Sequence, residues 1–202
     1  MKKVLVELNE REVKVLKRIL NESEVIVVDC IDGYNYEDYI GKTVKVTGDV
    51  ILRGLGLTKI PINFTEVGWD FDCSYNNLTS LEGAPEEVGG FFDCRNNNLT
   101  SLKGVPEKVG GGFACSFNKL TSLKGAPEKV GKSFYCSHNR LTSLEGSPRI
   151  VGGNFNCRNN KLTSLKGAPK KVGKIFDCSY NPLKSTKGKP KFIGGEFITS
   201  FM

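Results

Sequence analysis

The sequence contains few of the side chains that catalytic and metal sites use most often. His138 is its only histidine in 202 residues, which leaves no histidine pair for metal binding or for acid–base chemistry. The adjacent acids Glu86 and Glu87 correspond to residues of opposite charge, such as Lys170 and Lys171, in later copies of a repeated unit. A change in the sign of the charge is typical of a solvated surface and does not suit an acid–base pair. We therefore expect no enzyme activity, no bound metal and no cofactor.

Long apolar runs are also missing. No stretch of eighteen apolar residues occurs, so no membrane span is expected. The basic start of the chain is followed at Glu7 by an acid that ends the apolar stretch too early for a signal peptide. We expect a cytoplasmic protein, located in the host cytoplasm if the chain is viral.

The seven cysteines are never spaced as C-x-x-C, so they cannot converge on a tetrahedral zinc site. Thiols of a cytoplasmic protein stay reduced. We expect all seven, Cys30 included, to be free thiols buried as small apolar side chains.

A repeat of 21 residues dominates the rest of the chain, without an insertion or deletion. The unit reads V-G-G-x-F-x-C-x-x-N-x-L-T-S-L-x-G-x-P. Its phenylalanines are Phe71, Phe92, Phe113, Phe134, Phe155 and Phe176, and each is followed two residues later by a cysteine. Its asparagines are Asn76, Asn97, Asn118, Asn139, Asn160 and Asn181. Such regularity is typical of a solenoid of stacked coils.

Each recurring position of the unit has a structural interpretation. Phe and Cys two residues apart lie on one face of a short strand, and strands repeated in every coil can stack into a parallel sheet. The asparagine interrupts an apolar set, so we expect a buried ladder of amides that hydrogen-bond to neighbouring coils. A proline in every unit and the lack of helical periodicity predict an extended outer side.

The stretch FDCRNNNLTSL from Phe92 to Leu102 matches the leucine-rich-repeat frame L-x-L-x-x-N-x-L, with Phe and Cys at two leucine positions. The array resembles the compact repeats of secreted bacterial effectors, and more closely the F-D-C-S-x-N-x-L-T-S-L-E-G-A-P arrays of tailed bacteriophages. The resemblance covers residues 46–202. It implies a parallel sheet on a concave face, and it implies little about function because such arrays bind unrelated partners.

We divide the chain into a cap, residues 1–45, and an array, residues 46–202. The cap is expected to be a small α/β unit, with a helix that begins near Asn9 and a buried strand over residues 23–29. Within the array we expect a degenerate first coil at 46–66, regular coils at 67–192 and a capping coil at 193–202. Trp69 is expected to pack where cap and array meet.

The outward-facing strand positions vary between coils and carry aromatic and arginine side chains, the composition of an interaction surface. We therefore predict a non-catalytic module that binds a protein on its concave face, a host factor if the chain is phage-encoded. The candidate partner-binding residues are Asp72, Phe91, Asp93, Arg95, Phe117, Tyr135, His138, Asn156, Arg158 and Tyr180.

Two alternatives stay open. Residues 140–202 hold 12 basic and 3 acidic side chains, an excess that suits nucleic-acid binding. A structural role in a virion is the second alternative.

Overall fold

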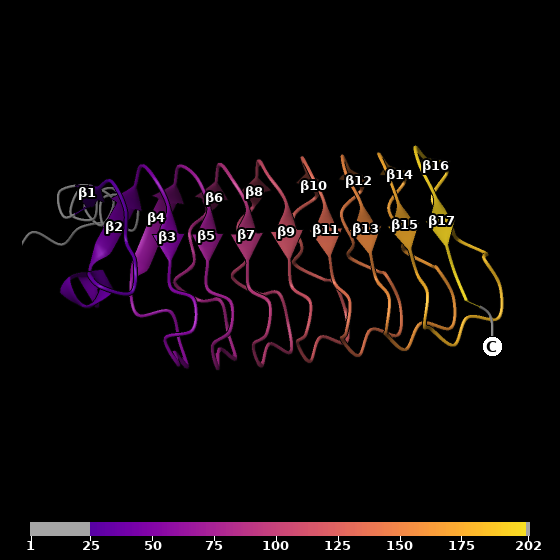
Figure 1. The fold of residues 1–202 in the computed structure, drawn as a ribbon, viewed down its shortest axis with the longest axis horizontal. Helices are drawn as coiled ribbons and strands as arrows, with labels where there is room; N and C mark the ends of the chain where they lie inside the picture. The colour runs from indigo at the N-terminus through magenta and orange to yellow at the C-terminus, as the bar shows by residue number, and fades with distance from the viewer. Residues whose placement is uncertain (1–24, 201–202) are drawn as a thin grey trace, which may run out of the picture.

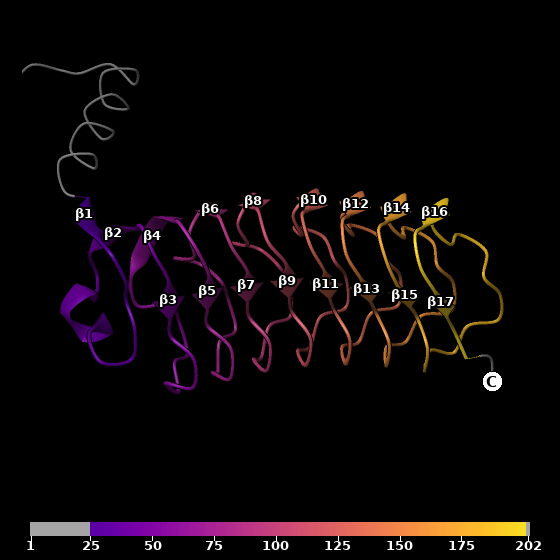
Figure 2. The ribbon, with the colours of Figure 1, turned by 45° about the horizontal axis from the view of Figure 1, so that its top comes forward.

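A computed structural model describes residues 25–200 as an elongated stack of coils built from two parallel β-sheets. The coils follow one another along the long axis from the N-terminal to the C-terminal end (Figure 1). Each regular coil contributes one short strand to each sheet, so consecutive strands in the sequence alternate between the two sheets (Figure 2). The described residues contain no α-helix, and the fold is a mainly-β solenoid.

Sheet 1 has nine strands in the order β1-β2-β4-β6-β8-β10-β12-β14-β16. Its first three strands are longer than the others, which have two residues each. The strands are β1 (Ile26–Val28), β2 (Thr43–Val46), β4 (Asn63–Val67), β6 (Glu87–Val88), β8 (Lys108–Val109), β10 (Lys129–Val130), β12 (Ile150–Val151), β14 (Lys171–Val172) and β16 (Phe192–Ile193).

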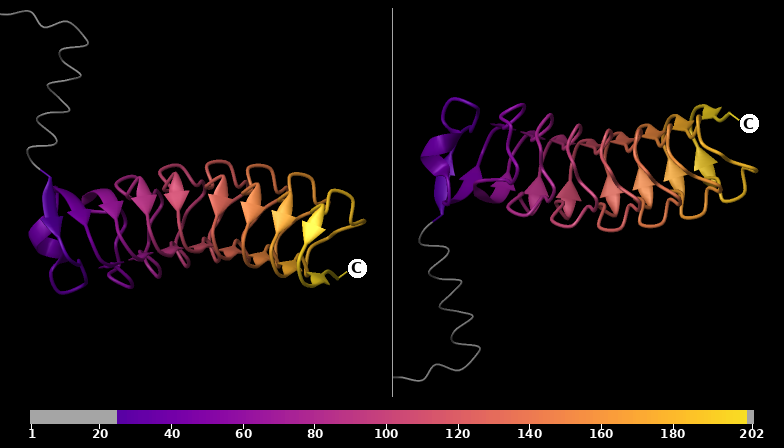
Figure 3. Two further views of the ribbon diagram at one scale, coloured as in Figure 1. Left: turned by 90° about the horizontal axis from the view of Figure 1, so that it is seen from above. Right: turned by 90° about the horizontal axis from the view of Figure 1, so that it is seen from below.

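Sheet 2 has eight strands that contain the predicted Phe positions or their equivalents. It lies on the opposite side of the solenoid from sheet 1 (Figure 3). The strands are β3 (Val50–Ile51), β5 (Phe71–Asp72), β7 (Phe92–Asp93), β9 (Phe113–Ala114), β11 (Phe134–Tyr135), β13 (Phe155–Asn156), β15 (Phe176–Asp177) and β17 (Phe197–Ile198).

The strand register confirms the 21-residue frame at both ends of sheet 2. Val50 pairs with Phe71 at the first coil, and Phe176 pairs with Phe197 at the last. Val50 therefore takes the place of the repeated Phe, as expected for a degenerate first coil. The side of each coil away from the repeated Phe is extended, and it forms a complete second parallel sheet that the sequence did not indicate.

The N-terminal part differs from the expected α/β cap. Strand β1 pairs with β2, and β2 pairs with β4, so residues from Ile26 onward already belong to sheet 1. The connection between β1 and β2 holds only a short 3-10 helix, η1 (Tyr36–Tyr39). Strand β1 is half-exposed rather than buried, because it forms the edge of the described sheet. The expected helix near residues 9–20 lies outside the described residues.

The core is a column of stacked phenylalanine rings with aliphatic side chains around it. Neighbouring rings from Phe71 to Phe197 have centroids 5.2–5.7 Å apart and lie within 13° of parallel. The ring separation is close to the strand spacing of about 4.8 Å, because consecutive rings belong to adjacent strands of one sheet. Leucines and the valines of sheet 1 complete this core.

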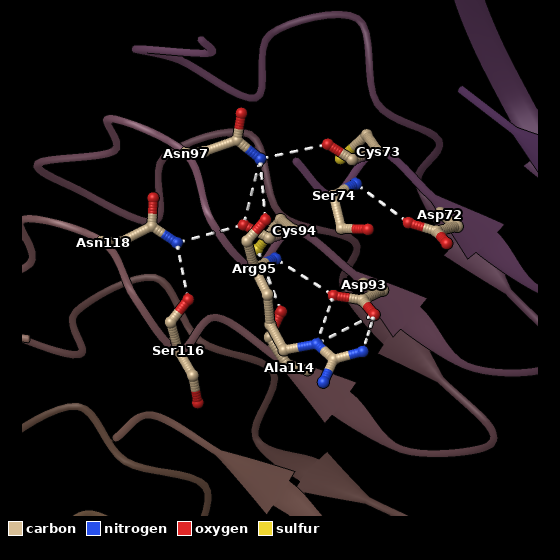
Figure 4. A network of polar contacts seen from close by, with 10 residues as sticks. All are labelled: Asp72, Cys73, Ser74, Asp93, Cys94, Arg95, Asn97, Ala114, Ser116 and Asn118. Carbon is tan, nitrogen blue, oxygen red and sulfur yellow. Dashed lines mark hydrogen bonds and ion pairs between the residues drawn. The ribbon is translucent and has the colours of Figure 1, made fainter. Parts of the chain in front are cut away.

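The asparagine ladder is present as predicted. Asn97 illustrates it: its Oδ1 accepts the Leu78 N–H of the preceding coil at 2.9 Å, and its Nδ2 donates to the Cys73 carbonyl at 3.0 Å. The same Nδ2 also donates to the carbonyls of Cys94 and Arg95 in its own coil (Figure 4). Asn118, Asn139, Asn160 and Asn181 repeat this arrangement. Each amide thereby satisfies backbone groups that the turn would otherwise leave buried without a partner.

Replacing Asn139 by alanine should lower the free energy of unfolding by about 1–3 kcal/mol. The buried N–H of Leu120 and the carbonyls of Cys115 and Cys136 lose their partner. Asn77→Ala is the control, since Asn77 is exposed and its loss should change stability by less than about 0.5 kcal/mol. Urea denaturation of both variants measures the difference, and equal stabilities would contradict a buried ladder.

Glycine is required at two kinds of position. The glycine before each x-Pro, such as Gly104, has a φ between +84° and +92°, a conformation that a residue with a side chain adopts only under strain. The glycine that directly follows the repeated valine of sheet 1 has a different role. These glycines are Gly68, Gly89, Gly110, Gly131, Gly152 and Gly173. A Cβ atom on Gly152 or its equivalents would lie well inside 3.0 Å of a backbone carbonyl oxygen in the preceding coil. Glycine therefore sets how closely successive coils approach.

The six cysteines of the repeat are free and buried, as predicted, whereas Cys30 is free and exposed. The expectation for Cys30 was wrong because it follows the edge strand of the described sheet, whose own side chains are half-buried or exposed. Burial raises the pKa of the Cys94, Cys136 and Cys157 thiols well above the usual range, so these groups remain protonated at neutral pH.

A thiol reagent should therefore modify one of the seven cysteines rapidly in the native protein and all seven after denaturation. Counting the released chromophore at pH 8 in buffer and in denaturant measures both values. Cys30→Ser should remove the rapid phase. Rapid reaction of two or more thiols in the native state would show that the repeat cysteines are accessible.

Candidate functional site

The outward face of sheet 2 brings most of the predicted residues together. Asp72, Asp93, Tyr135 and Asn156 occupy the same outward strand position in different coils, with Asp72 paired to Asp93 and Tyr135 to Asn156. Because the register is constant, the side chains of this position form one row across the sheet, with neighbours about 4.8 Å apart. Ala114 and Asp177 fill the same position in β9 and β15.

Acidic and amide side chains of this row support the turn that follows each strand. The Oδ1 of Asp72 accepts the Ser74 N–H at 2.8 Å, and the Oδ1 of Asn156 accepts the Arg158 N–H at 3.1 Å. Asp177 makes the same bond to Ser179 at 2.9 Å. These side chains therefore stabilise the local backbone, a role that the sequence analysis did not assign to them.

Asp93 and Arg95 form an ion pair on this face. The Nε of Arg95 donates to both Asp93 oxygens at 3.0 Å, and its Nη2 lies 2.6 Å from Oδ2 (Figure 4). The hydrogen bond to Asp93 raises the pKa of the Arg95 guanidinium. Asp93 is only 6% exposed, so the guanidinium, and not the carboxylate, is the group that this pair presents to solvent.

A second row lies beside the first, where the chain turns after each cysteine. We call it the aromatic row; its members are Tyr75, Asn96, Phe117, His138, Asn159 and Tyr180. All six have φ between +51° and +57°, the left-handed region that residues other than Gly, Asn, Asp and His rarely adopt. The Tyr75, Phe117 and Tyr180 side chains are 50%, 48% and 58% exposed. Tyr75 was not among the predicted residues, although it shares their position in the repeat.

Backbone hydrogen bonds hold the aromatic row in place. The N–H groups of Tyr75 and Phe117 donate to carbonyls of the following coil at 2.9 and 3.0 Å, and His138 does so at 3.1 Å. These bonds fix the position of the Cα atom to which each ring side chain is attached. The backbone of the row is therefore held in one conformation by the coil that follows each member.

Side chains of the row also contact each other and nearby arginines. The Phe117 and His138 rings stack with centroids 4.2 Å apart, and the Nε2 of His138 lies 3.1 Å from the Asn159 Nδ2. Partial burial, together with the charge of Arg158, lowers the pKa of His138 below its usual value. The imidazole is therefore neutral at physiological pH.

Arginines cover the two ends of the aromatic row. The Arg53 guanidinium lies 4.6 Å from the Tyr75 ring centroid, and the Arg158 guanidinium lies 5.0 Å from the Tyr180 centroid. Such cation–π pairs orient both side chains at the surface. Arg53 was not predicted, because the degenerate first coil hides its equivalence to Arg95 and Arg158.

Phe91 lies apart from the other predicted residues. With Trp69 and Lys132 it lines an open groove of about 640 Å³ over the glycines that connect sheet 1 to sheet 2. Trp69 is 67% exposed, so the expectation that it packs at a junction of cap and array was wrong. The glycine turn that precedes β5 holds it at the corner of the solenoid, with its ring outside the core.

Within residues 25–200, no group of three or more His, Cys, Asp or Glu side chains is arranged to hold a metal ion. The same residues contain no helix with the length and apolar character needed to cross a membrane. No protein-family model matches the chain, and no curated protein sequence matches it either.

Proposed function

We propose that this protein is a non-catalytic binding module of the leucine-rich-repeat type, and that the outward face of sheet 2 binds a protein partner. In this proposal the face of sheet 2 is the concave surface of the repeat family. The observation that carries the proposal is the aromatic row, in which exposed Tyr and Phe side chains occupy a backbone conformation that disfavours them.

The conformational cost of the row supports a binding role. A left-handed conformation costs most L-residues about 1–2 kcal/mol, whereas asparagine tolerates it because its side chain bonds locally. Asn96 and Asn159 show that the turn accommodates asparagine. Aromatic rings at the other four positions do not improve the core, since these residues are exposed. Their presence is consistent with selection for contact with another molecule.

The chemistry of the surrounding face supports the same proposal. The rings of Tyr75, Phe117 and Tyr180 belong to the aromatic row, and the guanidinium groups of Arg95 and Arg158 belong to the repeat position directly before it. From coil to coil the rings and the guanidinium groups alternate. Tyrosine and arginine side chains are among the most frequent energetic hot spots of protein interfaces. A host protein is the partner that the likeness to bacteriophage arrays suggests.

The test uses substitutions that the turn tolerates. Phe117→Asn and Tyr180→Asn place in the aromatic row the residue that already occupies two of its positions. Each variant should weaken binding of a partner captured from host lysate by about 30-fold, the effect of losing one hot spot, while the melting temperature is unchanged or higher. Binding is measured by surface plasmon resonance with the captured partner.

Lys124→Ala is the matched control, because Lys124 is exposed in the loop after Leu123 and belongs to neither row. It should leave the affinity unchanged. Full affinity in both asparagine variants would place the partner site elsewhere.

Nucleic-acid binding by the basic C-terminal coils is the second candidate. The exposed lysines Lys170, Lys171 and Lys174 favour it. If binding is lost only when these lysines and Lys189 are replaced, and if it falls steeply with added salt, the second candidate is supported instead of the first.

A further inference from the structure

A third row of side chains lies on the opposite side of the molecule, at the position that directly precedes each regular strand of sheet 1. We call it the charge row. All six members are exposed, and the sign of the charge changes once along the solenoid, at the middle. In chain order the members are Glu86, Glu107, Glu128, Arg149, Lys170 and Lys191.

Backbone contacts place the members of the charge row next to one another. The Glu107 N–H donates to the Glu86 carbonyl at 2.9 Å, and the Lys170 N–H donates to the Arg149 carbonyl at 2.9 Å. A similar bond of 2.8 Å joins Arg149 to Glu128 at the change of sign. Like charges are thus held about one strand spacing apart in each half of the row, an arrangement that is unfavourable within the chain.

Three other pairs of neighbouring positions on the solenoid instead join opposite charges between coils. Lys45 lies 2.6 Å from Glu66, Lys166 lies 2.9 Å from Glu145, and Lys108 pairs with Glu87. In residues 25–200, none of the six side chains of the charge row takes part in an ion pair. The row therefore offers three acidic and three basic groups to an external partner.

We propose that the charge row pairs with the charge row of a second copy of this chain that runs in the opposite direction. A two-fold axis parallel to the strands keeps this row facing itself and reverses the order of the coils. Glu86 then faces Lys191 of the second copy, Glu107 faces Lys170, and Glu128 faces Arg149. Because the sign changes at the midpoint, every one of these contacts joins opposite charges, as a self-complementary interface requires.

At the neighbouring strand position the same register sets Lys108 against Lys171 and Lys129 against Ile150 of the second copy. Glu87 neutralises Lys108 within its own chain, and the Lys171 ammonium lies 5.2 Å from the centroid of its own Phe192 ring, so this like-charge contact opposes the arrangement only weakly. The interface is charged and exposed, and pairs of this kind are individually weak and screened by salt. The dimer should therefore form at low ionic strength and dissociate as salt is added.

A polyanion fits the whole row less well than a second copy does. It would be attracted to the basic half, from Arg149 to Lys191, and repelled by the acidic half on the same line. A nucleic acid would thus use three coils and leave the three glutamates without a partner.

Sedimentation velocity of the full chain over a concentration series tests the proposal. We expect a concentration-dependent dimer in about 20 mM salt and a monomer in about 500 mM salt, where the Debye length is only a few ångströms. A monomer under both conditions at every concentration overturns the proposal.

Charge reversal identifies the contact. Glu107→Lys and Lys170→Glu should each weaken dimerisation at least about tenfold, because like charges then face each other across the interface. The double variant with both changes should restore it, since opposite charges again face each other. Each single variant should keep or raise its melting temperature, because the new charge lies between two opposite charges in its own chain.

Lys119→Glu is the control for Lys170→Glu. It makes the same change of net charge at an exposed position outside the charge row and should leave dimerisation unchanged. Two results count against the proposal. The first is a double variant that stays monomeric. The second is a parent chain that is monomeric but binds a labelled single-stranded oligonucleotide, together with a Lys170→Glu variant that no longer binds it. The charge row lies on the sheet opposite the aromatic row, so the outcome does not depend on the function proposed above.

Discussion

Replacing Gly152 by alanine should lower the free energy of unfolding by about 3 kcal/mol or more, the upper range for forcing extra atoms into a packed interior. The added Cβ would lie well inside 3.0 Å of the Gly131 carbonyl oxygen in the preceding coil. That oxygen belongs to the backbone, so it cannot swing away as a side chain can. Both coils must separate, and the strand pairing and ring stacking around them weaken together.

Gly56→Ala is the control for this experiment. Gly56 has a φ of +70°, and no atom lies within 4 Å of the position that a Cβ would occupy there. Alanine at this position should therefore cost only about 1–2 kcal/mol of left-handed strain. Urea denaturation followed by circular dichroism compares the two variants. Equal losses of stability in the two variants would mean that the glycines after the sheet 1 valines do not limit the spacing between coils.

The second large effect is expected for Phe113→Ala, with a loss of about 3–5 kcal/mol in the free energy of unfolding. The Phe113 ring is fully buried and stacks between Phe92, at 5.4 Å, and Phe134, at 5.2 Å. Its removal leaves a cavity between two rings that the backbone of sheet 2 holds apart. The neighbouring coils therefore cannot close the space.

Phe197→Ala is the matched comparison, because within residues 25–200 Phe197 stacks on Phe176 alone, and it is partly exposed. Its loss should cost less than half as much, since part of the ring already contacts water. Thermal and urea unfolding of the two variants provide the measurement. A similar loss at both sites would show that the stack contributes little beyond general burial.

The sequence was sufficient to predict the coil, because each structural requirement recurs at a fixed position. Asn118 could be recognised as buried from its place among apolar residues, and the structure confirms its bonds to Cys94 and Cys115. The second sheet was harder to predict, because strands such as Lys129–Val130 have only two residues and one buried side chain. Their β structure comes from pairing with neighbouring coils, a tertiary effect that a local pattern does not contain.

Predictions for single surface residues were less accurate for a related reason. Asp93 occupies an outward position, yet Arg95 covers it, and this pairing occurs in one coil only of the described chain. Trp69 and Cys30 were expected to be buried because of their type, but the corner and the edge where they lie leave them exposed. The positive φ of the aromatic row could have been suspected from Asn96 and Asn159, since asparagine favours this conformation.

The constant register also determines which changes in length the gene can accept. Every coil contacts its neighbours through the same set of positions, as the identical pairing of β11 with β9 and with β13 shows. Duplication or loss of one complete 21-residue unit would join two coils that already match, and would lengthen or shorten all three surface rows by one member. Loss of a single codon would instead leave one coil a residue short, so that its strands could not match both neighbouring coils with their core side chains still facing inward. Selection can therefore change the reach of these surfaces in whole steps, by recombination between repeats, without redesigning the core.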